Sequence, residues 1–135
     1  ERFDRITRIA AATFDVPIAL VSLVDADRQW FKSNYGLEAS DTSRDLTFST
    51  HVVHRKDELV VPDALLDERF ADNPLVNGEP YIRFYAGEPL ILKDGNCIGT
   101  LCLIDNRPRQ LDHRDLQMLR DLRDLVLEEI EPERR

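Results

Sequence analysis

The chain has 135 residues and a net charge of −8, with no cluster of basic residues. A chain of this length suits one domain with a sizeable core. Its acidic balance argues against binding to a nucleic-acid backbone or to an anionic membrane surface. No apolar run approaches the roughly 20 residues that cross a bilayer. We therefore expect a single domain over residues 1–135, and because it begins inside a predicted helix, we expect it to be part of a longer protein.

The two cysteines, Cys97 and Cys102, lie five residues apart in one predicted strand. Successive side chains of a strand point to opposite faces, so an odd offset separates the two thiols and they should not bridge. A chain without a disulfide framework or clustered thiol ligands suits the reducing cytoplasm.

The first elements in chain order are a helix and a hairpin. Apolar residues recur at three- and four-residue spacing through residues 2–14, which predicts a helix with one apolar stripe. The continuous apolar run 18–24 predicts a central strand. A turn at 25–27 leads into the aromatic segment 28–35, which predicts a second strand.

The middle of the chain is less regular. Residues 37–46 are polar and predict a loop, and residues 47–55 predict a short helix. Residues 59–61 predict a short strand that ends at Pro62, and because proline lacks an amide hydrogen this strand suits a sheet edge. Residues 63–80 contain several turn signals without a clear period, which predicts a binding loop, a lid or a disordered excursion.

Residues 81–105 consist of two apolar runs around the polar segment 93–96. The Asp-Gly pair in that segment predicts a tight primed hairpin turn. The second run, 97–104, is almost wholly apolar, which suits a strand covered on both faces. Within the first run, Ala86 and Gly87 indicate a bulge or a close backbone approach.

Asp112 is a suitable N-cap for a last helix that runs to about Glu131 and stops at Pro132. Its broad apolar stripe fits a helix that faces the core. Part of the stripe also fits a seam for a partner helix in a homodimer. The residues of that seam are Leu119, Leu122, Val126 and Ile130.

Because hairpins make antiparallel pairs, these elements predict an α+β fold with a single antiparallel sheet of five to six strands. The N- and C-terminal helices should cover one face. The short helix and the long loop should cover the other, where they are placed as a lid over a ligand.

Six segments, in this order, resemble a GAF domain of the bacterial type that precedes histidine kinase or diguanylate cyclase domains. They are Ile18–Asp25, Arg28–Ser33, Leu59–Ala64, Asp67–Val76, Ile82–Gly87 and Ile98–Asp105. The resemblance covers essentially the whole chain. It implies a cytoplasmic sensory module that binds a small molecule, dimerises through its terminal helices and acts on an output domain of the same chain. It also implies that Leu101 and Leu103 lie under the terminal helices, while Thr100 and Cys102 face the pocket.

The sequence departs from several better-known members of this family. Many bacterial relatives carry a cysteine two residues before the histidine of the short helix, where this chain has Ser49 and then His51. No Cys-His pair is present for covalent attachment of a bilin, and the pattern of cyclic-nucleotide-binding relatives is absent. The two cysteines are also fewer than the sulfoxide reductases of this family use. We therefore expect no resident cofactor.

The pocket that the resemblance implies should be lined by aromatic, hydroxyl-bearing and charged side chains. We expect Trp30, Phe48, Ser49, His51, Asp63, Tyr81, Arg83, Tyr85, Thr100 and Cys102 to line it. Three of them also have a structural interpretation: His51 as a hydrogen-bonded core histidine, Cys102 as a buried thiol, and Arg83 as the ion-pair partner of Asp63 or Glu79. His51 and His54 share a helix face, but no third ligand lies nearby, so no metal site is predicted.

Three hypotheses for function follow. The first is a regulatory module without catalysis that binds a small molecule and relays the signal through its terminal helices. The second is a dimerisation and relay module without a ligand. The third, ranked last, is a thiol-based methionine sulfoxide reductase.

Overall fold

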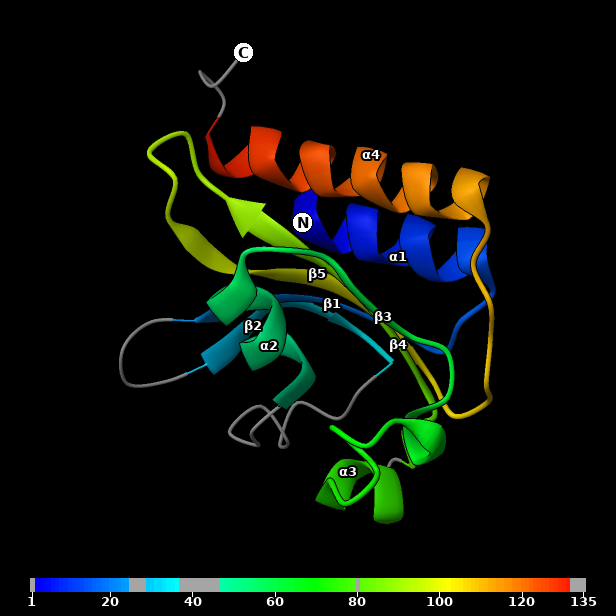
Figure 1. Cartoon of the computed structure of the whole chain (residues 1–135). Helices are drawn as coiled ribbons and strands as arrows, with labels where there is room; N and C mark the ends of the chain where they lie inside the picture. The colour runs from blue at the N-terminus through cyan, green and yellow to red at the C-terminus, as the bar shows by residue number, and fades with distance from the viewer. Residues whose placement is uncertain (1, 25–28, 37–46, 80, 132–135) are drawn as a thin grey trace.

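The computed structural model describes residues 2–24, 29–36, 47–79 and 81–131, and its centre is a five-stranded antiparallel sheet (Figure 1). The strand order is β2-β1-β5-β4-β3. The elements are α1 (Arg2–Phe14), β1 (Ile18–Val24), β2 (Gln29–Tyr35), α2 (Thr47–Arg55), β3 (Leu59–Val61), a 3₁₀ helix (Ala64–Leu66), α3 (Pro74–Asn77), β4 (Phe84–Ile91), β5 (Cys97–Asp105) and α4 (His113–Ile130). The turn predicted at 25–27 and the loop predicted at 37–46 lie outside the described residues.

Two helical layers cover the sheet (Figure 1). The terminal helices α1 and α4 lie side by side on one face, and α2 lies on the other with the connection between β3 and β4. This arrangement confirms the predicted α+β class, with five strands in the sheet. None of the helices in the described ranges is long and apolar enough to cross a membrane.

Strand alternation divides the core into two layers. Leu101 and Leu103 of β5 pack with the terminal helices, whereas Cys102 between them packs on the α2 side. The hydroxyl of Thr100 also meets α2, where it lies 3.4 Å from the Ser49 hydroxyl. The predicted division of the two faces is therefore confirmed.

The turn of the central hairpin differs from the prediction. Gly95 has a φ of +93°, but Asp94 is absent from the positive-φ residues of the described chain, so the turn is not primed. The Leu92 carbonyl accepts from the Gly95 N–H at 2.8 Å, and the Leu92 N–H donates to the Asn96 carbonyl at 2.8 Å. These bonds define a three-residue loop with one left-handed residue. The Asp94 carboxylate accepts the Asn96 N–H at 2.9 Å and so stabilises this alternative.

The irregularity predicted at Ala86 and Gly87 also lies elsewhere. β4 and β5 lose register between Pro89 and Ile91, where proline cannot donate a ladder hydrogen bond. Gly87 does mark a close approach, but the partner is a side chain rather than a backbone. A Cβ atom at Gly87 would lie 2.5 Å from the hydroxyl oxygen of Tyr85. The glycine therefore makes room for this tyrosine.

The connection between β3 and β4 is more regular than the sequence predicted, because two of its turn signals cap helices. The Asp63 carboxylate accepts an N–H at the start of the 3₁₀ helix at 3.2 Å. The Asn73 side chain does the same for α3 at 2.8 Å. Asp and Asn occur in turns and at helix N-caps for the same reason, so periodicity alone did not separate the two.

Gly36 and Gly95 form a matched pair for a test of these contacts, since their φ angles are +94° and +93°. A Cβ atom at Gly36 would lie 2.0 Å from the Pro17 carbonyl oxygen, whereas one at Gly95 would meet nothing within 4 Å. We expect Gly95→Ala to lower the free energy of unfolding by about 1 kcal/mol through the left-handed backbone alone. Gly36→Ala should cost more than about 3 kcal/mol, because the end of β2 must also move. Urea denaturation of both variants measures the difference, and equal losses would contradict the Pro17 contact.

Candidate functional site

The layer between α2 and strands β4 and β5 brings together most of the residues that the sequence proposed for a pocket. α2 presents Phe48 and Val52 to the sheet, and both are buried. Directly after the helix, Lys56 has a φ of +54° and its N–H donates to the Val52 carbonyl at 2.8 Å. The Lys56 ammonium group donates to the Gly95 carbonyl at 3.0 Å, which attaches the end of α2 to the central hairpin.

Three aromatic rings form a stack through this layer. Phe48 lies between Phe70 and Tyr85, with ring centroids 4.2 Å and 4.9 Å away. The edge of the half-buried His51 ring meets Phe70 at 5.1 Å, and the Arg69 guanidinium lies over the same ring at 5.1 Å. The stack therefore runs from a charged surface residue to the centre of the sheet.

A buried hydroxyl cluster lies at the inner end of the stack. The Ser49 hydroxyl lies 3.2 Å from the Tyr85 hydroxyl and 3.4 Å from the Thr100 hydroxyl. These three side chains and Cys102 have no solvent exposure. Burial raises the pKa of Tyr85 well above its usual value, and the neighbouring Cys102 thiol adds to the shift. The tyrosine is therefore a neutral hydrogen-bonding group at the centre of the sheet.

Because Phe48, Ser49, Tyr85, Thr100 and Cys102 are all fully buried, a ligand can reach them only if α2 or the connection beside it moves. The predicted site residues do lie together here, but they fill the layer between α2 and the sheet. Their side chains form a hydrogen-bonded and stacked core with a polar centre.

The remaining predicted residues lie apart from this cluster. Arg83 donates to both carboxylate oxygens of Asp63, at 2.7 Å and 2.8 Å, so its charge is matched within the chain. The same bonds are the first cause of the lowered pKa of Asp63. Tyr81 is 52% exposed and has a φ of +60°, a strained conformation for a residue with a side chain. The Trp30 side chain lies outside the part of the chain that the structure describes.

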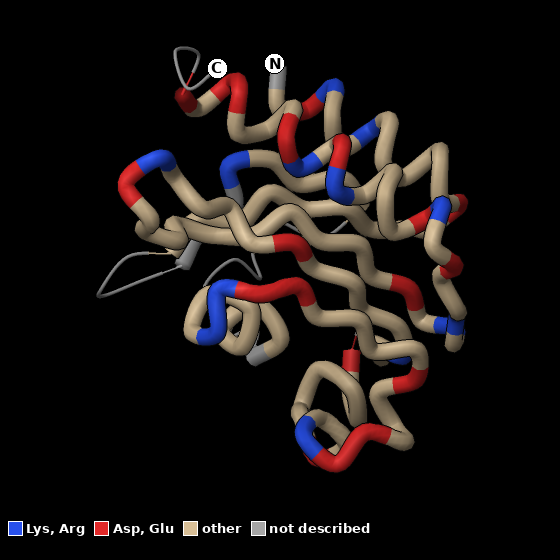
Figure 2. The backbone as a smooth tube through the Cα atoms, turned by 45° about the horizontal axis from the view of Figure 1, so that its top comes forward, with Lys and Arg blue, Asp and Glu red and all other residues tan. Residues whose placement is uncertain are grey.

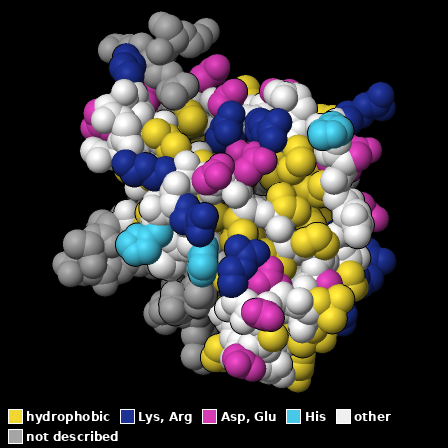
Figure 3. All heavy atoms as spheres, in the orientation of Figure 1, with side chains coloured by type: hydrophobic (Ala, Val, Ile, Leu, Met, Phe, Trp, Pro, Cys, Tyr) yellow, Lys and Arg dark blue, Asp and Glu magenta, His cyan; other side chains and the backbone are white. Residues whose placement is uncertain are grey.

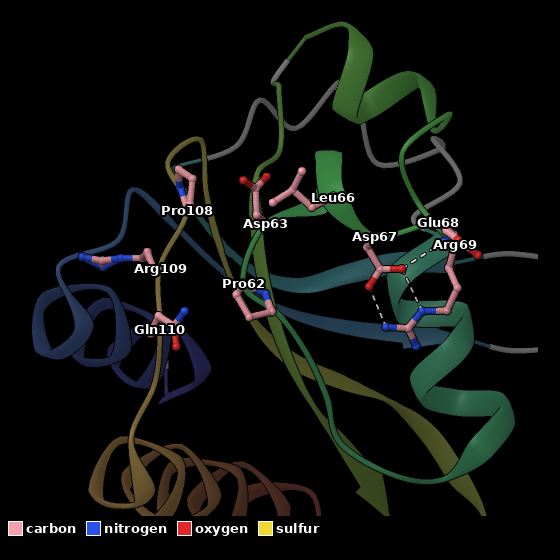
Figure 4. Close-up of a pocket in the computed structure, with 9 residues that line it drawn as sticks. All are labelled: Pro62, Asp63, Leu66, Asp67, Glu68, Arg69, Pro108, Arg109 and Gln110. Atoms are coloured by element: carbon pink, nitrogen blue, oxygen red, sulfur yellow. Dashed lines mark hydrogen bonds and ion pairs between the residues drawn. The ribbon is translucent and has the colours of Figure 1, made fainter.

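A surface cleft of about 820 Å³ opens between residues 62–69 and residues 108–110 (Figure 4). Its charged groups are largely matched within the chain: Asp67 binds Arg69 through both of its oxygens, at 3.0 Å and 2.7 Å. The Arg109 side chain points away from the cleft and donates to the Phe14 carbonyl at 2.8 Å. The sequence did not predict this cleft, because its two sides come from segments far apart in the chain.

The seam predicted for a partner helix packs within the chain instead. Leu119, Leu122 and Val126 are buried in the core under α4, and Ile130 is half-buried against the same core. A helical stripe cannot specify whether a sheet or a second helix covers it, and here the chain's own sheet does. The larger apolar side chains exposed on the terminal helices are Ile9, Met118 and Leu125. Acidic and basic residues both occur along these two helices (Figure 2).

The two thiols and the histidines offer little for catalysis or metal binding. Burial raises the pKa of Cys102 to about 12 and also raises that of the half-buried Cys97, so both thiols are protonated at neutral pH. Exposed His, Lys and Arg side chains gather over α2 (Figure 3). In the described ranges, no three His, Cys, Asp or Glu residues are placed to hold a metal ion.

An open antiparallel sheet between a pair of terminal helices and a short cover helix defines a class of small α+β domains. Within that class, this chain belongs to the GAF domain family, which matches residues 1–130. GAF domains are typically sensory or regulatory modules of signalling proteins, and the family resemblance drawn from the sequence is confirmed.

One relative is a cyclic di-GMP phosphodiesterase of Pseudomonas aeruginosa, which is 45% identical over 131 residues. The alignment covers 96% of this chain but only 22% of the relative. The chain therefore spans about a fifth of that protein.

Solved structures share the fold at low sequence identity. A GAF domain from an Acinetobacter phosphoenolpyruvate-protein phosphotransferase has a TM-score of 0.75 at 20% identity and covers 92% of this chain and 76% of that one. Free methionine-R-sulfoxide reductase of Neisseria meningitidis has a TM-score of 0.77 at 19% identity, with 97% and 77% covered. The PixJ GAF domain of Thermosynechococcus elongatus has a TM-score of 0.71 at 17% identity, with 96% and 84% covered. These likenesses show the fold alone.

The hydroxyl cluster predicts a measurable effect of removing one oxygen atom. Tyr85→Phe keeps the aromatic stack but deletes the hydroxyl that Ser49 meets, so we expect a loss of about 1 kcal/mol in the free energy of unfolding. Tyr35 is exposed and serves as the matched control, and Tyr35→Phe should change stability by less than about 0.5 kcal/mol. Denaturation curves compare the two, and an unchanged Tyr85→Phe would contradict a contribution of the cluster to stability.

The raised thiol pKa values predict slow alkylation. At pH 8 a Cys97→Ala variant, which retains only Cys102, should react with iodoacetamide no faster than the protein unfolds, because the remaining thiol is buried and protonated. In denaturant it should react as a free thiol does. Rapid alkylation of the folded variant would show that Cys102 is accessible.

Proposed function

We propose that the chain is a non-catalytic regulatory module that binds a small molecule beneath α2 and passes the signal through its terminal helices to an output domain. The observation that carries this proposal is the buried hydroxyl cluster of Ser49, Tyr85 and Thr100. Hydroxyl groups in an otherwise aromatic and apolar layer provide directional hydrogen bonds for a ligand once α2 is displaced.

The two faces of β4 and β5 support the relay. Tyr85 and Cys102 pack under α2, while their strand neighbours Ala86, Leu101 and Leu103 pack under α1 and α4. A close-packed core transmits displacement, so a ligand that moves α2 also shifts the surface on which the terminal helices rest. The shift is limited by the difference in the ligand's affinity for the two arrangements.

The state of the thiols supports the absence of catalysis. A thiol-based sulfoxide reductase needs a thiolate, yet burial raises the pKa of both Cys97 and Cys102. The likeness to reductase structures is at 19% identity or below and carries the fold only.

We further propose a cytoplasmic output enzyme that makes or degrades cyclic di-GMP. Support comes from the Pseudomonas aeruginosa phosphodiesterase, which shares 45% identity with this module. This proposal adds a phosphodiesterase to the diguanylate cyclase and histidine kinase outputs that the sequence suggested. The acidic composition supports a role without nucleic-acid or membrane contact.

A second candidate is a module that dimerises and relays without a ligand. It is favoured by the full burial of the hydroxyl cluster and by the exposed apolar residues Ile9, Met118 and Leu125 on the terminal helices. In this case the homodimer forms through the outward faces of α1 and α4.

Thermal unfolding with a metabolite library, which includes nucleotides, nucleobases and amino acids, tests the first candidate. We expect at least one compound to raise the Tm of the wild type, and we expect Tyr85→Phe to reduce the shift while Tyr35→Phe retains it. Light scattering over a dilution series tests the second, with Leu125→Glu as the variant that should dissociate a dimer. A dimer that no compound stabilises would favour the second candidate over the first.

A further inference from the structure

Glu88 is a buried carboxyl group on the sheet face that α4 covers. Its strand neighbours on that face, Ala86 and Leu90, belong to the apolar core, and Glu88 itself is 1% exposed. Its Oε1 accepts from Arg123 Nη1 of α4 at 2.9 Å. Its Oε2 is buried and has no hydrogen-bond donor in the described structure. An unmatched carboxylate oxygen in such a place is destabilising.

A second carboxyl group completes the cluster. Glu58, directly before β3, accepts from Arg120 Nε and Nη2 of α4 at 3.0 Å and 2.9 Å. β3 and β4 are antiparallel with Leu59 paired to Gly87, so Glu58, one residue earlier, lies opposite Glu88 at the next position along β4. The two carboxyl groups therefore face each other closely enough for each to affect the pKa of the other. Acidic and basic side chains lie side by side on this surface (Figure 3).

Among the described residues, the charged groups that act on Glu88 come from the segment before β3 and from α4. Glu58 approaches from the segment before β3, and Arg120 and Arg123 approach from α4. Arg123 also binds Asp124 of the same helix at 3.1 Å. On β5, the residue paired with Glu88 is Leu101, which carries no charge.

Two ionised carboxylates cannot donate to each other, whereas one proton provides the missing donor. Burial raises the pKa of Glu88 to about 8, and the adjacent Glu58 adds to the shift, while Arg123 and Arg120 oppose it. Arg120 in turn lowers the pKa of Glu58. The proton therefore resides on Glu88, where Oε2 can donate it to Glu58.

We propose that Glu58 and Glu88 form a one-proton latch, in which a proton shared by the two carboxyl groups holds α4 on the sheet and its loss loosens that helix. The latch stands whether or not a ligand binds beneath α2, because it lies on the opposite face of the sheet. Since α4 is a terminal helix, the latch would make the position of that helix depend on pH.

The direction of the pH dependence follows from the linkage between proton binding and the docking of α4. When α4 leaves the sheet, water reaches Glu88 and its pKa returns toward the ordinary value for glutamate, so the docked state binds the proton more tightly. The proton's contribution is complete below the ordinary glutamate pKa and is lost as pH rises to about 8. Between pH 7 and pH 9 the docking equilibrium should fall roughly tenfold and then level off.

Carboxyl ¹³C NMR of glutamate-labelled chain locates the proton. We expect one glutamate resonance in the wild type to titrate near pH 8, and we expect it to be missing in Glu88→Gln. Glu58→Gln removes the neighbouring negative charge and should lower this midpoint. Arg123→Gln removes a positive charge and should raise it. A wild type in which every glutamate titrates below pH 6 would overturn the proposal.

Amide hydrogen exchange measures the docking of α4. Protection factors for residues 119–127, relative to those of α2, should fall roughly tenfold from pH 7 to pH 9 in the wild type. Glu88→Gln should remove this fall, because its amide donates permanently to Glu58. The matched control is Glu79→Gln, at an exposed carboxyl group, which should retain the fall. An identical fall in the wild type and in Glu88→Gln would also overturn the latch.

Discussion

The two-residue alternation of side chains in β4 and β5 is the constraint on which the rest of this GAF domain depends. Both strands are covered on both faces, so every second residue belongs to a different layer of the core. Tyr85 and Cys102 therefore contact the α2 layer, while Leu101 and Leu103 support the terminal helices. A one-residue change of register would exchange the two sets and destroy both layers at once. The same alternation joins the proposed sensing face to the face that carries α4.

The polar groups of the two interior clusters meet partners that are distant in the chain. On the α2 side, the Ser49 hydroxyl hydrogen-bonds to those of Tyr85 and Thr100. On the helix side, Glu88 relies on Arg123 and on a proton that it shares with Glu58. Each cluster places polar side chains beneath a helix. The first is neutral and suits hydrogen bonding to a ligand, and the second is ionisable and suits coupling to pH.

Arginine side chains connect segments that are distant in the chain through hydrogen bonds and ion pairs. Arg109 of the β5–α4 connection donates to the Phe14 carbonyl at the end of α1, and its Nε lies 3.3 Å from the buried Asp105 carboxylate. Arg83 binds Asp63 across the cover, and Arg120 binds Glu58 across the edge of the sheet. These cations are occupied within the chain. The surface cleft beside Asp63 and Arg109 is therefore a poor site for a charged ligand despite its size.

The sequence by itself determined the layer order and the secondary structure outside residues 63–80. Periodicity separates helices from strands, and Pro62 marks the edge strand correctly because its missing amide hydrogen is a local property. Local signals also placed Asp112 as a helix cap. Only the tertiary structure decided that the Asp-Gly turn contains one left-handed residue, that Arg83 binds Asp63, and that the apolar seam of α4 faces its own sheet. It also revealed Glu88, an acidic residue at an inward position of β4, as the partner of Glu58 and Arg123. Most of these outcomes depend on contacts between residues distant in the chain, such as Arg123 and Glu88, which are 35 positions apart. The spacing of residue types along a chain carries no record of which partner each side chain meets.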